Sequence, residues 1–234
     1  MGVRIYLLLL LSAALSACSQ SDAGENDIAA EFEKSGYYRT PDQFATASSR
    51  GDEKAVALFI ESGMDLNGPG HSGLPPLMAA AQAGRMKTAE LLLANGADVN
   101  AATRNGWTAL MYAVTKRDSL EMAQLLVKKG ADVNGKTSDG TTPLMIAAQA
   151  PNSIATVRFL LESGARVNDK SNFGDTALTM AAENGSAAET VLMLLYGGAD
   201  VAIATEHGET AYQLAKKGGF EEISRILEPR QSKL

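Results

Sequence analysis

The chain has 234 residues, of which 45% are hydrophobic, and this is enough to bury a core in one domain or in one elongated array of small units. Its formal net charge of -6 argues against a general nucleic-acid-binding protein, because neutralising phosphates requires a clustered excess of Lys and Arg. We therefore expect no nucleic acid among its partners.

The first segment has the parts of a secretory signal peptide. Arg4 supplies a basic start, and residues 5–15 form a nearly unbroken apolar run that small residues follow. The run is shorter than the about 20 apolar residues that a transmembrane helix needs. Residues 1–17 are thus predicted to be a signal peptide and not part of the fold.

The letters LSAC at residues 15–18 resemble the lipobox of bacterial lipoproteins. The resemblance implies cleavage before Cys18, a diacylglyceryl group on its thiol, and an acyl chain such as palmitate on its new amino group. The alternative is an incidental thiol in an ordinary signal peptide, but Cys18 is the only Cys of the chain. Because Ser19 rather than Asp follows it, the enterobacterial sorting rule favours the outer membrane over the inner. We expect a lipid-anchored envelope protein that faces the periplasm.

Residues 18–41 are predicted to be a lipid-anchored tether, because they begin as a small, polar and acidic stretch with little to bury. Some twenty flexible residues would hold a folded domain roughly 25 Å from the lipid. A short helix over residues 27–34 would shorten that reach.

From residue 42 onward the chain repeats itself every 33 or 34 residues. Each repeat has an Ala-rich segment with helical spacing, followed by a second apolar segment that ends in Gly and a turn. The first segments are LPPLMAAAQAG (74–84), WTALMYAVTK (107–116), TTPLMIAAQA (141–150), DTALTMAAENG (175–185) and ETAYQLAKKG (209–218). Thr142, followed by Pro143, is a good helix start, since Thr caps free amide groups and Pro is preset for the first helical position.

These units resemble the ankyrin repeat, a 33-residue unit that contains the letters TPLH and two antiparallel helices. The resemblance implies an all-α solenoid of stacked helix-turn-helix units with hairpin loops. It covers residues 42–228 in about six repeats and leaves a C-terminal tail over 229–234. The chain departs from the pattern where Met78, Met111 and Met145 replace the signature His and Pro75 replaces the Thr.

One segment, GADVNGKT at residues 130–137, matches the phosphate-binding loop pattern GxxxxGK followed by Ser or Thr. A true phosphate loop follows a buried strand and opens directly into a helix. Here a segment with helical spacing precedes Gly130, and the same repeat position holds GADVNAAT, GARVNDKS and GADVAIAT. We expect a repeat turn, no nucleotide and no enzymatic activity. A nucleotide-hydrolysing enzyme is the alternative, and it rests on this match alone.

Few other sequence patterns point to a catalytic or metal-binding site. The two His residues lie in repeats two and six, too far apart in a linear stack to share a metal ion. The Met residues allow a soft-metal site for Cu(I) as an alternative, but Met78, Met111 and Met145 suit packing between inner helices. We therefore expect no cofactor and no metal.

The ankyrin resemblance implies a protein partner bound at the hairpin tips and the exposed face of the inner helices. Trp107 and the nearby Arg104 have the composition of an interface anchor, although Trp107 could instead pack on its own hairpin. The charge is uneven: residues 84–136 hold eight Lys or Arg against five Asp or Glu, and residues 162–209 hold two against eight. This asymmetry could orient a partner, or it could only preserve solubility. The candidate binding residues are His71, Arg104, Asn105, Trp107, Lys116, Asp139, Phe173, Asp175 and His207.

The sequence thus predicts a lipid-anchored envelope protein that binds another protein without catalysis. Two more specific roles stay open. The chain could be an inhibitor or immunity protein against a periplasmic toxin enzyme, or a structural scaffold for an envelope enzyme.

Overall fold

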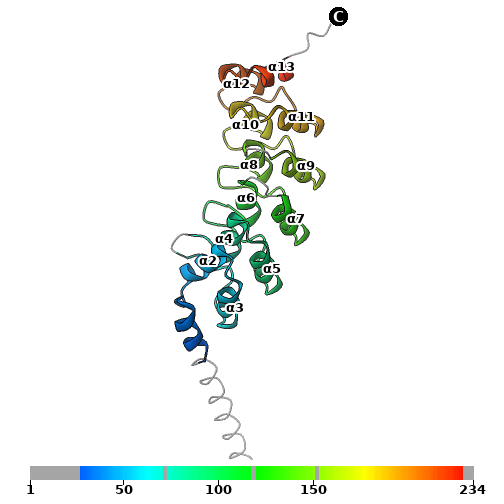
Figure 1. Cartoon of the computed structure of the whole chain (residues 1–234). Coiled ribbons are helices and arrows are strands. Elements are labelled where there is room, and N and C mark those ends of the chain that lie inside the picture. The colour runs from blue at the N-terminus through cyan, green and yellow to red at the C-terminus, as the bar shows by residue number, and fades with distance from the viewer. Residues whose placement is uncertain (1–26, 71–72, 117–119, 151–152, 229–234) are drawn as a thin grey trace, which may run out of the picture.

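The computed structural model describes residues 27–70, 73–116, 120–150 and 153–228, which form one elongated stack of helix pairs (Figure 1). Each pair has an inner helix and an outer helix joined by a short turn, and a hairpin loop leads to the next pair. The inner helices are α2 (Pro41–Arg50), α4 (Pro76–Ala83), α6 (Ala109–Val114), α8 (Pro143–Gln149), α10 (Ala177–Glu183) and α12 (Ala211–Lys217). The outer helices are α3 (Glu53–Glu61), α5 (Met86–Ala94), α7 (Leu120–Lys128), α9 (Ile154–Glu162), α11 (Ala188–Tyr196) and α13 (Glu221–Leu227). The predicted all-α repeat fold is confirmed.

Thr side chains begin most of the inner helices. The hydroxyl oxygen of Thr142 accepts a hydrogen bond from the backbone N–H of Met145 (3.3 Å), and the N–H of Thr142 donates in turn to the Met145 sulfur (3.4 Å). Thr108, Thr176 and Thr210 cap α6, α10 and α12 in the same way. Each cap satisfies an amide that the first helical turn leaves free. Met145, which replaces the signature His in this repeat, therefore supports the start of α8.

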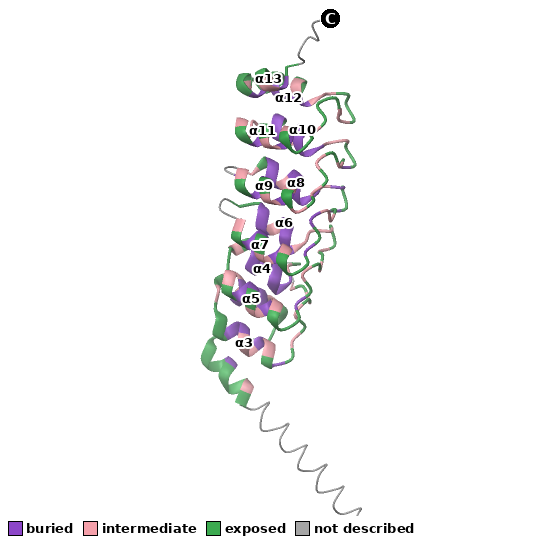
Figure 2. Ribbon diagram, turned by 90° about the vertical axis from the view of Figure 1, so that its right-hand side faces the viewer, coloured by how far each residue is buried: buried purple, intermediate pink, exposed green. Residues whose placement is uncertain are grey.

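The core runs along the stack, because each inner helix packs on the neighbouring inner helices and most outer helices pack on a neighbouring outer helix as well as on the inner helix of their own pair. Met78, Met111 and Met145 are buried between the inner helices, as the packing interpretation requires. The outer helices share one buried column (Figure 2), which consists of Phe59, Leu92, Leu126, Leu160, Leu194 and Leu227. No single pair could enclose such a column, so each repeat is stable only against its neighbours.

The N-terminal boundary differs from the prediction of a tether over residues 18–41. The short helix predicted over residues 27–34 is present over residues 27–35, but Phe32 and Tyr37 are only 6% and 8% exposed, which a tether does not explain. Their rings meet Phe59 of the first pair, with centroids 4.9 and 6.0 Å apart. An open stack must cover the apolar side of its first repeat, and this segment covers it. The tether prediction is corrected for residues 27–39, while the earlier part and the signal peptide lie outside the described residues.

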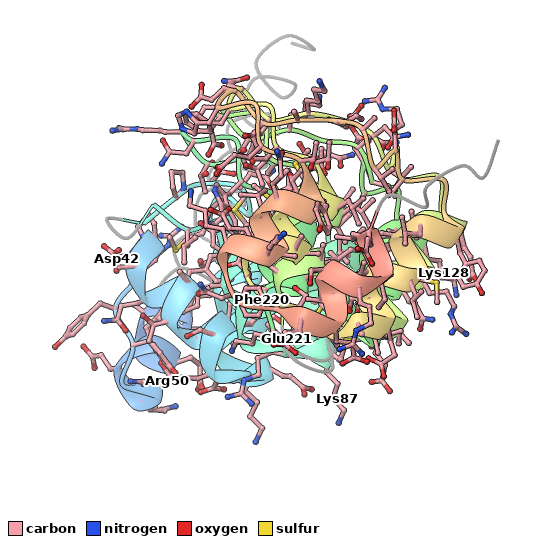
Figure 3. All side chains as sticks on the ribbon, turned by 90° about the horizontal axis from the view of Figure 1, so that it is seen from above. Asp42, Arg50, Lys87, Lys128, Phe220 and Glu221 are labelled. Atoms are coloured by element: carbon pink, nitrogen blue, oxygen red, sulfur yellow. The ribbon has the colours of Figure 1, made fainter. Side chains whose placement is uncertain are left out.

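The hairpin loops are joined by a ladder of Asn side chains. The amide oxygen of Asn134 accepts from the N–H of Arg166 (2.9 Å), and its amide nitrogen donates to the carbonyl of Gly164 (3.0 Å) in the next repeat. Asn100 and Asn168 make the same pair of bonds one repeat before and after. Viewed along the stack, the hairpins lie on one side, and Arg50 and Lys87 lie on the opposite side (Figure 3). The loops are therefore held in a regular row along one edge.

The described helices are short. The longest in the stack is α2, with ten residues, and no helix in the described ranges is long and apolar enough to span a bilayer.

Candidate functional site

The hairpins of repeats three to six close in the same way around a hydroxyl side chain. In the fourth repeat the N–H of Thr137 donates to the carbonyl of Thr141 (3.0 Å), and the N–H of Thr141 donates back to the Thr137 hydroxyl (2.9 Å). Gly140 follows the turn with a φ of +81°, and its N–H donates to the carbonyl of Thr137 (2.9 Å). That left-handed conformation is strained for residues with a Cβ, so Gly is favoured there. The same role falls to Thr103, Ser171 and Thr205 in the neighbouring hairpins.

Backbone hydrogen bonds also join successive hairpin tips. The N–H of Ser138 donates to the carbonyl of Asn105 (2.9 Å), that of Asn172 to Asp139 (2.8 Å), and that of Glu206 to Phe173 (2.8 Å). The two central residues of each tip are thereby fixed by their main chain, while their side chains stay exposed. A row of tips with a rigid backbone and free side chains is suited to binding a partner without a large ordering cost.

The structure brings most of the predicted binding residues onto this row. The exposed side chains at the turns are Arg104, Asn105, Asp139, Phe173 and His207, and the half-buried Trp107 and Asp175 stand at the foot of their hairpins. Lys116 lies apart from them, because it follows the far end of α6, on the edge opposite the hairpins. His71 lies outside the described residues.

The Trp107 ring packs on Tyr112, a residue of α6 that points toward the hairpins. The Trp107 and Tyr112 rings are 5.1 Å apart at an angle of 43°. Both line a cleft of about 550 Å³ between the hairpins of repeats two and three, together with Leu74 and Arg104. A cleft of about 700 Å³ lies away from the tips, between residues 28–39 and the end of α3. Trp107 thus packs on its own repeat and also lines a cleft, and its role as a contact for a partner stays a prediction.

The sequence interpretation missed a line of apolar side chains on the inner helices. Tyr112, Ile146 and Met180 are half-buried, and each stands four residues after the Thr that caps its helix. Burial raises the pKa of the Tyr112 hydroxyl. The amide of Gln149 lies 2.9 Å from the Met180 sulfur, which links adjacent repeats. The 33- or 34-residue period, read at this one position, is the signal that could have revealed the line.

Acidic groups gather where repeats five and six meet. Partial burial raises the pKa of the Asp175 carboxyl, the negative charge of Glu206 raises it further, and the Ser171 hydroxyl and His207 act in the opposite direction. His207 lies 3.8 Å from Glu206, and both side chains are substantially exposed. At the other end of the row Arg104 is exposed and has no ion-pair partner among the described residues. The tips therefore carry positive charge in repeat three and negative charge in repeats five and six.

GADVNGKT has the geometry of a repeat turn. Gly130 ends the outer helix with a φ of +93°, and its N–H donates to the carbonyl of Val127 (3.0 Å). The ammonium of Lys136 lies 3.3 Å from the Asp169 carboxylate, while Thr137 closes the hairpin. The next helix begins only at Pro143. Without a helix start next to Lys136, the segment lacks the cluster of free amides that holds phosphates in a true phosphate loop.

Within the described ranges there is no group of three or more His, Cys, Asp or Glu side chains that could hold a metal ion. The predicted lipid-attachment residue, Cys18, lies outside those ranges.

Comparison with known proteins agrees with the repeat geometry. A family model described as ankyrin repeats (3 copies) matches residues 44–137, 102–171 and 144–232. No curated protein matches the chain. The three segments together span the helix stack, and proteins built from such repeats are generally non-enzymatic scaffolds for interaction with other proteins.

Proposed function

The chain belongs to the ankyrin-repeat family, and we propose that it is a lipid-anchored protein of the bacterial envelope that binds another protein through its hairpin tips and the adjoining inner-helix face. The lipid is carried by Cys18, and the stack faces the periplasm from the outer membrane. The row of exposed side chains on tips with a hydrogen-bonded backbone is the observation that carries the binding proposal.

Two aromatic groups mark the contact. Trp107 and Tyr112 offer a half-buried aromatic pair in repeat three, and Phe173 is 51% exposed in repeat five. Helices pack about 10 Å apart, so two repeats separate these groups by about 20 Å. Aromatic side chains are enriched among the residues that dominate binding energy. A partner that touches both groups must present a surface at least that long.

The binding proposal is tested with the full chain as bait in envelope extract. We expect Phe173→Ala and Trp107→Ala to reduce the recovery of one specific protein at least about tenfold, because each removes an aromatic contact. Lys87→Ala is the matched control, since Lys87 lies on the opposite edge (Figure 3). Equal recovery by all four proteins would contradict binding at the tips.

Because the Trp107 ring packs on Tyr112, melting curves of the variants are needed beside the recovery assay. Phe173 has no ring partner in the described part of the chain, so its replacement reports on the partner more directly. The captured protein also decides between the two specific roles. A toxin enzyme whose activity falls on binding identifies an inhibitor or immunity protein, while an enzyme that stays active in the complex identifies a scaffold.

The anchor is tested separately by metabolic labelling with palmitate. Cys18→Ser should abolish labelling and leave the signal segment uncleaved, because the thiol that accepts the diacylglyceryl group is lost. Persistent labelling of the variant would contradict the assignment of Cys18. Density-gradient separation of the labelled wild-type protein distinguishes the outer from the inner membrane.

A further inference from the structure

Exposed apolar side chains are concentrated in repeat five, where two of them lie on α11, away from the hairpin tips. The large hydrophobic residues that stay exposed in the described ranges are Tyr38, Phe173, Leu192, Tyr196 and Val201. Three of them lie within ten residues: Leu192 is 40% exposed, Tyr196 is 87% exposed and Val201 is 47% exposed. Val201 lies in the last hairpin loop of the described residues, whereas Val133, at the same repeat position in a loop that has described loops on both sides, is buried. Leu192 and Tyr196 need another explanation.

The register of the outer helices shows that these two residues are exceptions. Two residues before the buried column stand Ala57, Glu90, Gln124, Arg158, Leu192 and Arg225, and two residues after it stand Glu61, Ala94, Lys128, Glu162 and Tyr196. All of these positions are exposed except the half-buried Ala57, and Lys128 projects from the side of the stack in the view along its axis (Figure 3). Leu192 and Tyr196 are the large apolar side chains in the two columns. The fold does not require them, since Val191 and Leu194 already fill the core of α11.

The same face of the preceding outer helix carries opposite charges. Arg158 and Glu162 occupy on α9 the positions that Leu192 and Tyr196 occupy on α11, and both are exposed without an ion-pair partner in the described residues. Positions four residues apart lie on one side of a helix. When two such helices meet antiparallel, the first position of each faces the second position of the other.

We propose that this face, defined by Arg158, Glu162, Leu192 and Tyr196, binds a second copy of the chain around a two-fold axis parallel to the stack. Such an axis keeps each repeat level with the same repeat of the second copy and reverses the direction of its helices. Leu192 then meets the second copy's Tyr196, and Arg158 meets its Glu162, each contact occurring twice. One axis satisfies both pairs, as a self-complementary interface requires. On α7 the same two-fold axis places Gln124 opposite Lys128 of the second copy, which creates no like-charge contact.

Charge reversal on α9 provides the sharpest test. The full chain is purified in a mild detergent with reductant, which excludes a disulfide through Cys18, and its mass is measured by light scattering over a range of concentrations. We expect a mass near twice that of one chain. Arg158→Glu and Glu162→Arg should each weaken dimerisation about tenfold or more, because each places like charges opposite each other twice. The double variant should recover the wild-type dissociation constant within about threefold, since it restores both pairs with reversed signs.

Leu192→Glu should give a monomer at every concentration, and Glu61→Lys, on the same face of α3, is the control that leaves the dimer unchanged. If Leu192→Glu fails to fold, the single and double variants at Arg158 and Glu162 still test the proposal, because both side chains are exposed. A monomeric wild type overturns the proposal, and so does a double variant no better than the single ones. A wild-type monomer that captures another envelope protein in a Leu192-dependent manner would also overturn it. The outcome is independent of the tip-binding function, because the purified chain alone is measured.

Discussion

Asp175 shows how the fold changes the chemistry of a single residue. Its pKa is raised mainly by partial burial, so the folded protein takes up a proton on this carboxyl more readily than the unfolded chain does. The associated stability is fully present below the unfolded pKa and is lost as the pH rises through the folded pKa. At neutral pH the ionised Asp175 therefore costs stability.

Asp175→Asn should raise the melting temperature at pH 7, because the neutral amide removes this cost and its oxygen can still accept from the Ser171 hydroxyl. The difference from the wild type should shrink below about pH 3, where the carboxyl of Asp175 is protonated as well. Thermal melting at both pH values checks the sign. An equal difference at both would show that ionisation is not the cause.

Gly185 lies where repeat five meets the last repeat, and its replacement should be poorly tolerated. A Cβ built there would lie 2.2 Å from the Phe220 ring, and the backbone φ is +64°. Gly185→Ala should lower the free energy of unfolding by about 2 kcal/mol or more, from steric overlap added to backbone strain. Gly208→Ala is the matched control, because it has a φ of +77° and open space around the new Cβ. Denaturant unfolding should show the smaller loss for the control.

At the scale of an element, most hairpin loops depend on the next repeat, because an Asn side chain of one loop bonds the backbone of the following loop. Asn67, Asn100, Asn134 and Asn168 each accept a backbone N–H of the following loop, and the equivalent residue in the fifth loop is Ala202. Within the described residues no loop of this kind follows the sixth pair. The side chain is therefore polar in the four loops that have a following loop among the described residues and apolar in the fifth.

Asn134→Ala should lower the free energy of unfolding by about 1–2 kcal/mol, because it removes two hydrogen bonds between repeats. The reverse change, Ala202→Asn, should leave stability within about 0.5 kcal/mol, since no following loop among the described residues offers the partner groups. Urea unfolding of both variants gives the comparison. Stabilisation by Ala202→Asn would show that the gain comes from within the loop.

The whole molecule behaves as a one-dimensional array, in which each repeat depends on its neighbours. Its ends are closed differently. The helix at 27–35 and Tyr37 cover the first pair, whereas Phe220 and the charged side of α13 close the last. Damage at one end should therefore stay local.

Phe32→Ala should destabilise the protein by about 3 kcal/mol, because a buried ring against Phe59 is lost. Hydrogen exchange should show lost protection in α2 and α3, with α9 to α12 unchanged. Tyr38→Ala is the control, since Tyr38 is 76% exposed. Uniform loss of protection along the stack would contradict the array description.

Local patterns were sufficient to predict much of this protein. The period, the Thr caps and the Gly that ends each outer helix depend on neighbours in the chain, and from them the all-α stack and the position of GADVNGKT in a turn could be predicted. The row of tip residues followed as well, because side chains at one repeat position must lie along one edge. The assignments that involve Cys18 stay predictions.

Tertiary structure decided what depends on surfaces meeting across the stack. In the sequence Phe32 and Tyr37 belong to a predicted polar tether. In the structure they are buried, because they pack on the open side of the first repeat. Lys116 follows the inner helix that contains the hairpin-facing Tyr112, and the direction of that helix places it at the opposite edge. In the sequence Leu192 and Tyr196 cannot be told from core residues of α11. Only the structure shows that other residues of this helix already fill the core. The reason is common to all of them: a sequence records which side chains are apolar or charged, but only the packed stack determines which of them remain uncovered.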